Sequence, residues 1–197
     1  MFEINYYIYN FDKKNLSKIS LENFEKEYEE IYGQFELKIF NNSFRTINFD
    51  CEKNNHFSSK VEEKKFYETL PTEIINAWFY NLLLVAIHLN FNNYIAIQDI
   101  ESSLWLEFYK ENNKLKIGLL IGDHSNIEKT ILYSPKEFKY IWQAKEIEYN
   151  TFLVELYLKT KKFILEIQTI NPLLLKSKAI NQLLEKYNIF LNSYHQQ

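Results

Sequence analysis

Two carboxylates near the middle of the chain have the chemistry and the spacing of a catalytic or metal-binding pair. Asp99 and Glu101 are two residues apart, between an apolar run and the serines at positions 102 and 103. On extended backbone, residues two apart project to the same side, so these carboxylates could act as an acid and a base or hold a metal ion. A competing interpretation is favoured, in which both residues end a strand and form a solvated turn, the usual environment of Asp and Glu.

The remaining nucleophiles and imidazoles do not form a recognisable catalytic set. Asp123, His124 and Ser125 follow one another directly, whereas catalytic triads are assembled from residues far apart in the chain. The four histidines are not spaced as a helical metal pair and Cys51 is the only cysteine, so we predict no zinc site. The glycine-rich and serine-centred motifs of nucleotide-binding proteins and hydrolases are missing from the sequence, and we therefore predict no cofactor.

The chain is mildly acidic, and its basic residues are almost all lysines. Twenty-three basic and 26 acidic residues give a formal net charge of -3, and Arg45 is the only arginine. Nucleic-acid binders usually carry a clustered basic face with arginines that contact phosphates and guanines. We therefore predict no nucleic-acid partner.

Composition and the amino-terminal sequence predict a folded cytoplasmic protein. Of the 197 residues, 46% are hydrophobic and 25% are charged, which suits a single globular domain over residues 1–197. A single cysteine fits a reducing compartment. The sequence has neither a basic region followed by an apolar stretch at its start nor an uncharged apolar run of about 18 residues, so we predict no secretory signal and no membrane partner.

At the start of the chain, hydrophobic periodicity predicts a strand, a helix and a hairpin. Residues 2–9 alternate in the manner of a half-buried strand. A helix with an acidic outer face is predicted from Ser20, as its N-cap, to Gly33, as its C-terminal stop. Residues 35–39 and 44–49 are predicted to be the two strands of a hairpin.

The rest of the chain is predicted to form a helix, a run of strands and two further helices. An apolar helix is expected from Val61, bent at Pro71, through to Leu89. Helical periodicity returns at 149–167, and Asn171 then caps a last helix. The predicted strands between them are 94–100, 104–109, 115–120, 131–133 and 138–144. A run of strands followed by helices predicts an α+β fold, with an antiparallel sheet packed against several helices.

One succession of elements stands out in the second half of the chain. The helix 78–89 is followed by the strands 94–99 and 104–108, and the closing helix 152–167 leads into Asn171-Pro172. This pattern resembles the immunity proteins that protect bacteria from polymorphic or contact-dependent toxins. The resemblance implies a cognate toxin domain as partner, no catalysis and no cofactor. It also implies a carboxylate-rich interface where the toxin is basic, because complementary charge speeds encounter and selects the partner.

Two acidic groups are the predicted contact residues for such a toxin. The first group lies in loops and comprises Asp99, Glu101 and Asp123. The second group lies on the outer face of the first predicted helix and comprises Glu22, Glu25 and Glu29. The competing interpretation for each residue is a solvated surface charge.

Two other functions remain open at the level of sequence. One is a hydrolase or transferase in which Asp99, Glu101 and His124 converge on a cleft. The other is a structural or oligomeric subunit in which apolar strands near a sheet edge pair between chains.

Overall fold

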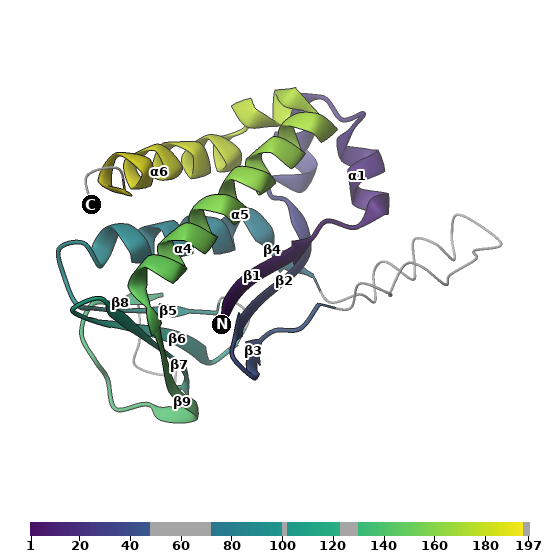
Figure 1. Cartoon of the computed structure of the whole chain (residues 1–197). Helices are drawn as coiled ribbons and strands as arrows, with labels where there is room; N and C mark the ends of the chain where they lie inside the picture. The colour runs from purple at the N-terminus through teal and green to yellow at the C-terminus, as the bar shows by residue number, and fades with distance from the viewer. Residues whose placement is uncertain (48–71, 100–101, 123–129, 195–197) are drawn as a thin grey trace.

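The computed structural model describes residues 1–47, 72–99, 102–122 and 130–194. Figure 1 shows two antiparallel sheets and a group of helices that covers the larger one. The predicted α+β class is confirmed, with two sheets where the sequence suggested one.

The smaller sheet is built around its central strand, β2. Its strands are β1 (Phe2–Tyr7), β2 (Tyr32–Ile39), β3 (Asn42–Phe44) and β4 (Glu73–Ile74). β2 pairs antiparallel with each of the other three. The predicted hairpin is present as β2 and β3, and the pairing of Ile39 with Asn42 leaves Phe40 and Asn41 as its two-residue turn. Its second strand therefore starts and ends earlier than the predicted range 44–49.

The larger sheet has five strands in the order β8-β5-β6-β7-β9. The bounds of its strands are β5 Tyr94–Gln98, β6 Leu104–Glu111, β7 Lys114–Ile121, β8 Ile131–Leu132 and β9 Lys139–Glu148. All five predicted strands are thus present, and β9 extends past its predicted end at residue 144. Because β8 and β9 form opposite edges, the chain between them crosses the sheet on the side away from the helices, where Phe138 packs against Trp105 (Figure 1).

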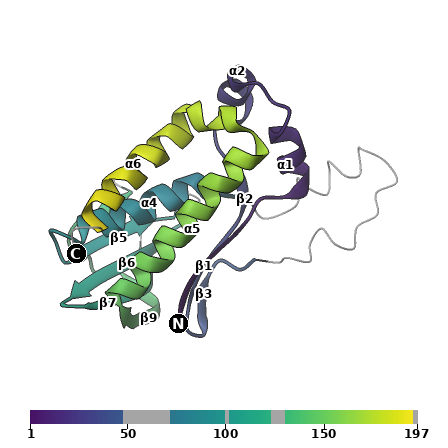
Figure 2. The same ribbon diagram turned by 45° about the horizontal axis from the view of Figure 1, so that its top comes forward.

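Three long helices, α4, α5 and α6, lie together over the larger sheet (Figure 2). The helical elements are α1 (Asn10–Leu16), α2 (Leu21–Asn23), the π-helical turn η1 (Phe24–Tyr28), α4 (Ile75–His88), α5 (Tyr149–Ile170), the 3-10 helix η3 (Pro172–Lys176) and α6 (Lys178–Tyr194). One cluster of buried apolar side chains includes residues of both sheets and of all three long helices. Within it, Trp78 of α4 stacks on Phe35 of β2 with ring centroids 5.4 Å apart. Within the described ranges, no helix has both the length and the apolar character needed to cross a bilayer.

The helix predicted from Ser20 to Gly33 is wrong beyond Tyr28. Ser20 does cap it, because its hydroxyl oxygen accepts a backbone N–H of the first turn at 3.2 Å. The helical segment ends at Glu29, which has a φ of 61°, and Gly33 lies within β2. A Cβ at Gly33 would stand 2.2 Å from the backbone oxygen of Tyr7, so this glycine is required by the close approach of β1.

Two further elements differ from the prediction. The sequence pattern does not predict α1, because Leu16 is its only buried residue and the helix therefore has no apolar stripe. Glu73 and Ile74 form β4 rather than a turn of helix, and α4 begins at Ile75, whose N–H donates to the backbone oxygen of Ile31 at 2.9 Å. The earlier part of that predicted helix lies outside the described residues.

Candidate functional site

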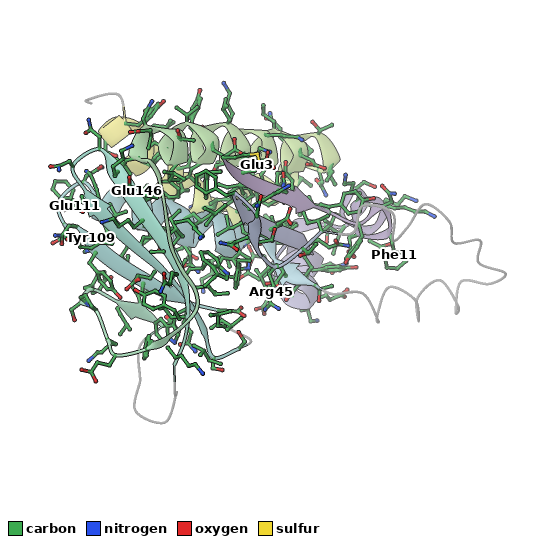
Figure 3. The ribbon with its side chains drawn as sticks, turned by 60° about the horizontal axis from the view of Figure 1, so that its bottom comes forward. Glu3, Phe11, Arg45, Tyr109, Glu111 and Glu146 are labelled. Atoms are coloured by element: carbon green, nitrogen blue, oxygen red, sulfur yellow. The ribbon has the colours of Figure 1, made fainter. Side chains whose placement is uncertain are left out.

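Arg45, the only arginine, connects the two sheets through two carboxylates. It follows β3 directly and has a φ of 61°. Its Nε lies 2.9 Å from Oε1 of Glu73 in β4, and its Nη2 lies 2.7 Å from Oδ2 of Asp99, which follows β5. Figure 3 shows Arg45 in the region where the two sheets meet. We refer to Arg45, Glu73 and Asp99 as the arginine cluster.

The carboxylates of the arginine cluster are buried and hydrogen-bonded. Asp99 is 2% exposed, and its carboxylate accepts hydrogen bonds from Arg45 and from the hydroxyl of Ser102. The second carboxylate oxygen of Glu73 accepts the indole N–H of Trp78 at 2.9 Å. Buried carboxylates are tolerated when they are both paired and hydrogen-bonded. These contacts therefore indicate that Asp99 has a structural role in the fold. The strand does end before Asp99, but the solvated turn predicted there is wrong for this residue.

A small cavity with a mixed polar and apolar lining adjoins the arginine cluster. Its volume is about 30 Å³, which is room for about two water molecules. The side chains of Trp78, Asn81 and Gln98 line it together with the two carboxylates. The cavity can therefore hold water, and it is too small for a metabolite.

Of the first predicted acidic group, the structure describes only Asp99. Glu101, Asp123 and His124 fall outside the described residues. The toxin contacts predicted for Glu101 and Asp123, and the convergence of Glu101 and His124 with Asp99, therefore stay predictions. A contact between the carboxylate of Asp99 and a partner would first require its release by Arg45, because that carboxylate is not on the surface. Among the described residues, no group of three or more His, Cys, Asp or Glu side chains is placed to hold a metal ion.

The second predicted acidic group lies on a short segment that is rich in glutamate. Residues 21–30 include five glutamates and one lysine, and we call them the acidic segment. The side chains of Glu22, Glu27 and Glu29 are exposed. Together with α6, the segment borders an open hollow of about 370 Å³. Glu22 and Glu29 are thus exposed as predicted, but Glu29 lies at the end of the helical segment instead of on its outer face, and Glu25 is half-buried.

The other two glutamates of the acidic segment, Glu25 and Glu30, accept hydrogen bonds from other parts of the fold. Oε1 of Glu25 accepts the backbone N–H of Lys178 at 2.5 Å, at the first residue of α6. A carboxylate there satisfies an N–H that the helix itself leaves free and interacts favourably with the helix dipole. Glu30 accepts the amide of Asn76, whose Oδ1 in turn accepts the N–H of Ile31 at 2.8 Å. In Figure 2 the acidic segment accordingly lies beside the junction of α5 and α6.

A third polar group, which the sequence did not reveal, lies on the larger sheet. We define the outer face of this sheet as the one away from α4, α5 and α6. Glu107 of β6 shares this face with the buried residues Tyr94 and Trp105, and its carboxylate accepts the hydroxyl of Tyr140 in β9 at 2.7 Å. We call Glu107, Tyr94 and Tyr140 the phenol–carboxylate cluster.

Glu107 raises the pKa of both tyrosines in this cluster. For Tyr140 the hydrogen bond to Glu107 is the largest cause, followed by burial, and the pKa rises to about 12. For Tyr94 burial comes first and the charge of Glu107 second, and its pKa is raised further. Both phenols therefore stay protonated and neutral at physiological pH. The one sequence signal for this cluster is a glutamate inside the otherwise apolar and aromatic run 104–109.

Comparisons of the chain with protein-family models, with curated proteins and with solved structures found no match. Functional inference for this protein therefore rests on its own residues and their geometry.

Proposed function

We propose that this protein is a non-catalytic binding protein, an immunity protein that neutralises a cognate bacterial toxin in the cytoplasm by direct binding. The observation that carries the proposal is the acidic segment. Glu22, Glu27 and Glu29 are exposed, and none of them is paired with a cation among the described residues. A basic toxin surface would supply the missing positive charge.

Unpaired carboxylates on one exposed segment act on a partner chiefly before contact. Their summed field raises the encounter rate of an oppositely charged surface, and salt screens this effect over about 8 Å at physiological ionic strength. Once the partner is bound, complementary charges also fix its orientation. Glu25 supports this surface indirectly, because its bond to the start of α6 holds the acidic segment against the helical layer.

The element order also supports the proposal. The helix, two strands and closing helix on which the resemblance to immunity proteins rests are present as α4, β5, β6 and α5. The last of them leads into Asn171, which caps η3 through its side-chain oxygen at 3.1 Å from the N–H of Leu173.

The test is co-purification with the product of the open reading frame directly upstream. The affinity-tagged chain and that product are expressed together, and survival of the cells and recovery of a complex are measured. Neutralisation by direct binding predicts both survival and a stable complex. Survival without a complex, or a complex that leaves the toxic activity intact, would contradict the proposal.

A matched pair of charge reversals tests the acidic segment itself. The double variant Glu22→Lys/Glu29→Lys is expected to slow association about tenfold or more at low salt, within the usual range for electrostatic steering. The control Glu137→Lys/Glu185→Lys makes the same change of charge at two exposed positions outside the segment. Equal association rates for the two variants would show that only net charge matters and would remove the segment from the interface.

The two alternative functions gain no support from the described contacts. For a hydrolase or transferase, Asp99 is the only proposed group that the structure describes, and it is engaged by Arg45. For pairing between chains, the exposed edge strand β9 is interrupted by two register shifts opposite β7 and carries Lys139 and Lys145. Bulges and lysines are devices that protect an edge from added strands.

A further inference from the structure

Glu107 occupies an unusual position on the outer face of the larger sheet. It alternates along β6 with the aromatic residues Trp105 and Tyr109, so all three side chains point to the same side. Its direct neighbours across the sheet are Ala96 of β5 and Gly118 of β7. Because alanine and glycine have the smallest side chains, neither neighbour fills the space beside the carboxylate.

The charge of Glu107 is not balanced by any cation among the described residues. The side chain is 9% exposed, and the hydrogen-bond donor it contacts is the neutral hydroxyl of Tyr140. The nearest lysine in register on this face, Lys116, pairs with Glu111 at 2.8 Å instead. Figure 3 shows Glu111 at one end of the sheet, near Tyr109. A buried carboxylate that lacks a counter-charge is costly, so Glu107 would bind a cation that could reach it.

The ring of Tyr140 covers the space beside Glu107 on the side of Gly118. A Cβ at Gly118 would stand 3.0 Å from Cε1 of Tyr140 and 3.4 Å from Oε2 of Glu107, so the tyrosine ring lies over the glycine to reach the carboxylate. Tyr140 is 44% exposed and belongs to the edge strand β9, next to one of its register shifts. Its side chain can therefore turn toward solvent without moving the core.

A ring that turns away would leave a carboxylate floor between aromatic walls. Tyr94, Trp105 and Tyr109 surround Glu107 on the outer face. Aromatic faces attract cations through their quadrupole, and a carboxylate adds a charge-assisted hydrogen bond to an N–H donor. The combination suits an organic cation with a small charged head better than an anion or a neutral ligand.

We propose that Glu107 is the floor of a binding site for one alkylammonium or guanidinium group, which takes the place of the Tyr140 hydroxyl. The group could belong to a free amine or to a lysine or arginine side chain of another protein. This site is separate from the acidic segment and does not depend on the proposed toxin partner.

The test is a titration of the full-length chain with n-butylammonium and ethylguanidinium chlorides, followed by the indole N–H resonances of the three tryptophans. Sodium chloride at equal ionic strength corrects for screening. In a second arm, short blocked peptides with a single central lysine or arginine replace the small cations. Binding of the small cations identifies a site that recognises the charged head alone. Binding of the peptides without binding of the small cations identifies a site for a protein side chain.

Two variants with opposite expected effects make the test specific. Glu107→Gln keeps the shape and removes the charge, so binding should weaken at least tenfold. Tyr140→Phe removes the hydroxyl that competes for the carboxylate, so binding should tighten several-fold. Glu111→Gln, which neutralises a carboxylate of the same strand already paired with Lys116, should leave binding unchanged.

Three results would overturn the proposal. The first is that neither the cations nor the peptides perturb the wild type or Tyr140→Phe. The second is binding that persists in Glu107→Gln, and the third is weaker binding in Tyr140→Phe. Because Tyr140→Phe alters an exposed edge residue, it keeps the test decisive even if Glu107→Gln fails to fold.

Discussion

Asp99 and Glu107 are both buried carboxylates on the larger sheet, yet their surroundings balance them in different ways. Asp99 is paired with the guanidinium of Arg45 at 2.7 Å and also accepts a hydroxyl, so its charge is neutralised inside the fold. Glu107 accepts a hydrogen bond from the phenol of Tyr140, which carries no charge. The comparison indicates that the partner, rather than the burial, decides whether a carboxylate is structural or available for binding. Loss of Arg45 would leave the charge of Asp99 buried without a partner, whereas the charge of Glu107 can still be neutralised by a bound cation.

Removal of Arg45 should have the largest effect. In Arg45→Met, the carboxylates of Glu73 and Asp99 keep their burial and lose their shared counter-charge, which should lower the free energy of unfolding by about 3 kcal/mol. Urea denaturation followed by tryptophan fluorescence measures it. A loss below about 1 kcal/mol would mean that the arginine cluster behaves as a surface ion pair.

Neutralising each carboxylate in turn tests the comparison directly. Asp99→Asn breaks the pair with Arg45 and should cost about 2 kcal/mol, because a partly buried guanidinium is left without its closest anion. Glu107→Gln removes a charge that pairs with no cation in the described part of the chain, and it should change stability by less than about 1 kcal/mol in either direction. Equal losses in the two variants would mean that the fold balances the two carboxylates in the same way.

The acidic segment also contains one glutamate that is bonded within the fold and one that is exposed, and the expected effects on stability are smaller. Glu25→Gln weakens the bond to the N–H of Lys178 and should lower stability by about 1 kcal/mol, since a charged acceptor at a helix start is lost. Glu29→Gln, at an exposed position of the same segment, should be neutral within about 0.5 kcal/mol. Thermal unfolding of the two variants side by side provides the measurement. A larger effect at Glu29 would indicate a contact of its own within the fold.

The smallest expected effect is on the titration of one phenol. The pKa of Tyr140 is raised from 10.0 to about 12, with its hydrogen bond to Glu107 as the main cause. A raised pKa in the folded state favours the protonated form, so this contribution to stability is present below about pH 10 and is lost as the pH rises to about 12. In Glu107→Gln the pKa of Tyr140 should fall toward 10. Phenolate absorbance, with Tyr140→Phe subtracted, would reveal an unchanged pKa if Glu107 were not the cause.

The elements with an unambiguous period were predictable from the sequence. Strands β5, β6 and β7 and helix α5 lie where their apolar periodicity places them. The segment from Ser20 to Gly33 was not, because the helical pattern of apolar residues continues to Ile31, past the end of the helical segment at Glu29. Tyr32 and Gly33 pair with β4 in the smaller sheet, which overrides the local preference there, and no local window contains that information.

The candidate sites also differ in whether their residues are close together in the sequence. The exposed glutamates of the acidic segment could be placed from sequence, because all of them lie on one short stretch of chain. Arg45 and Asp99 are 54 residues apart, and Glu107 and Tyr140 are 33 apart, so nothing in the spacing links them. Glu107 and Tyr140 meet through strand register, which sets which side chains face each other across β6, β7 and β9. Arg45 and Asp99 follow strands of different sheets, so they meet only because the two sheets pack together.

By itself, the sequence determined the fold class, the course of the central strands and the acidic character of residues 21–30, because periodicity and charge are local properties of the chain. Only the tertiary structure decided that Asp99 is buried against Arg45 and that Glu107 lies beneath Tyr140, with no cation beside it among the described residues. The physical reason is that the cost of a buried charge depends on which groups the folded chain brings within hydrogen-bonding distance of it. Those groups come from other strands, and their identity is fixed by the register and by the order of the strands.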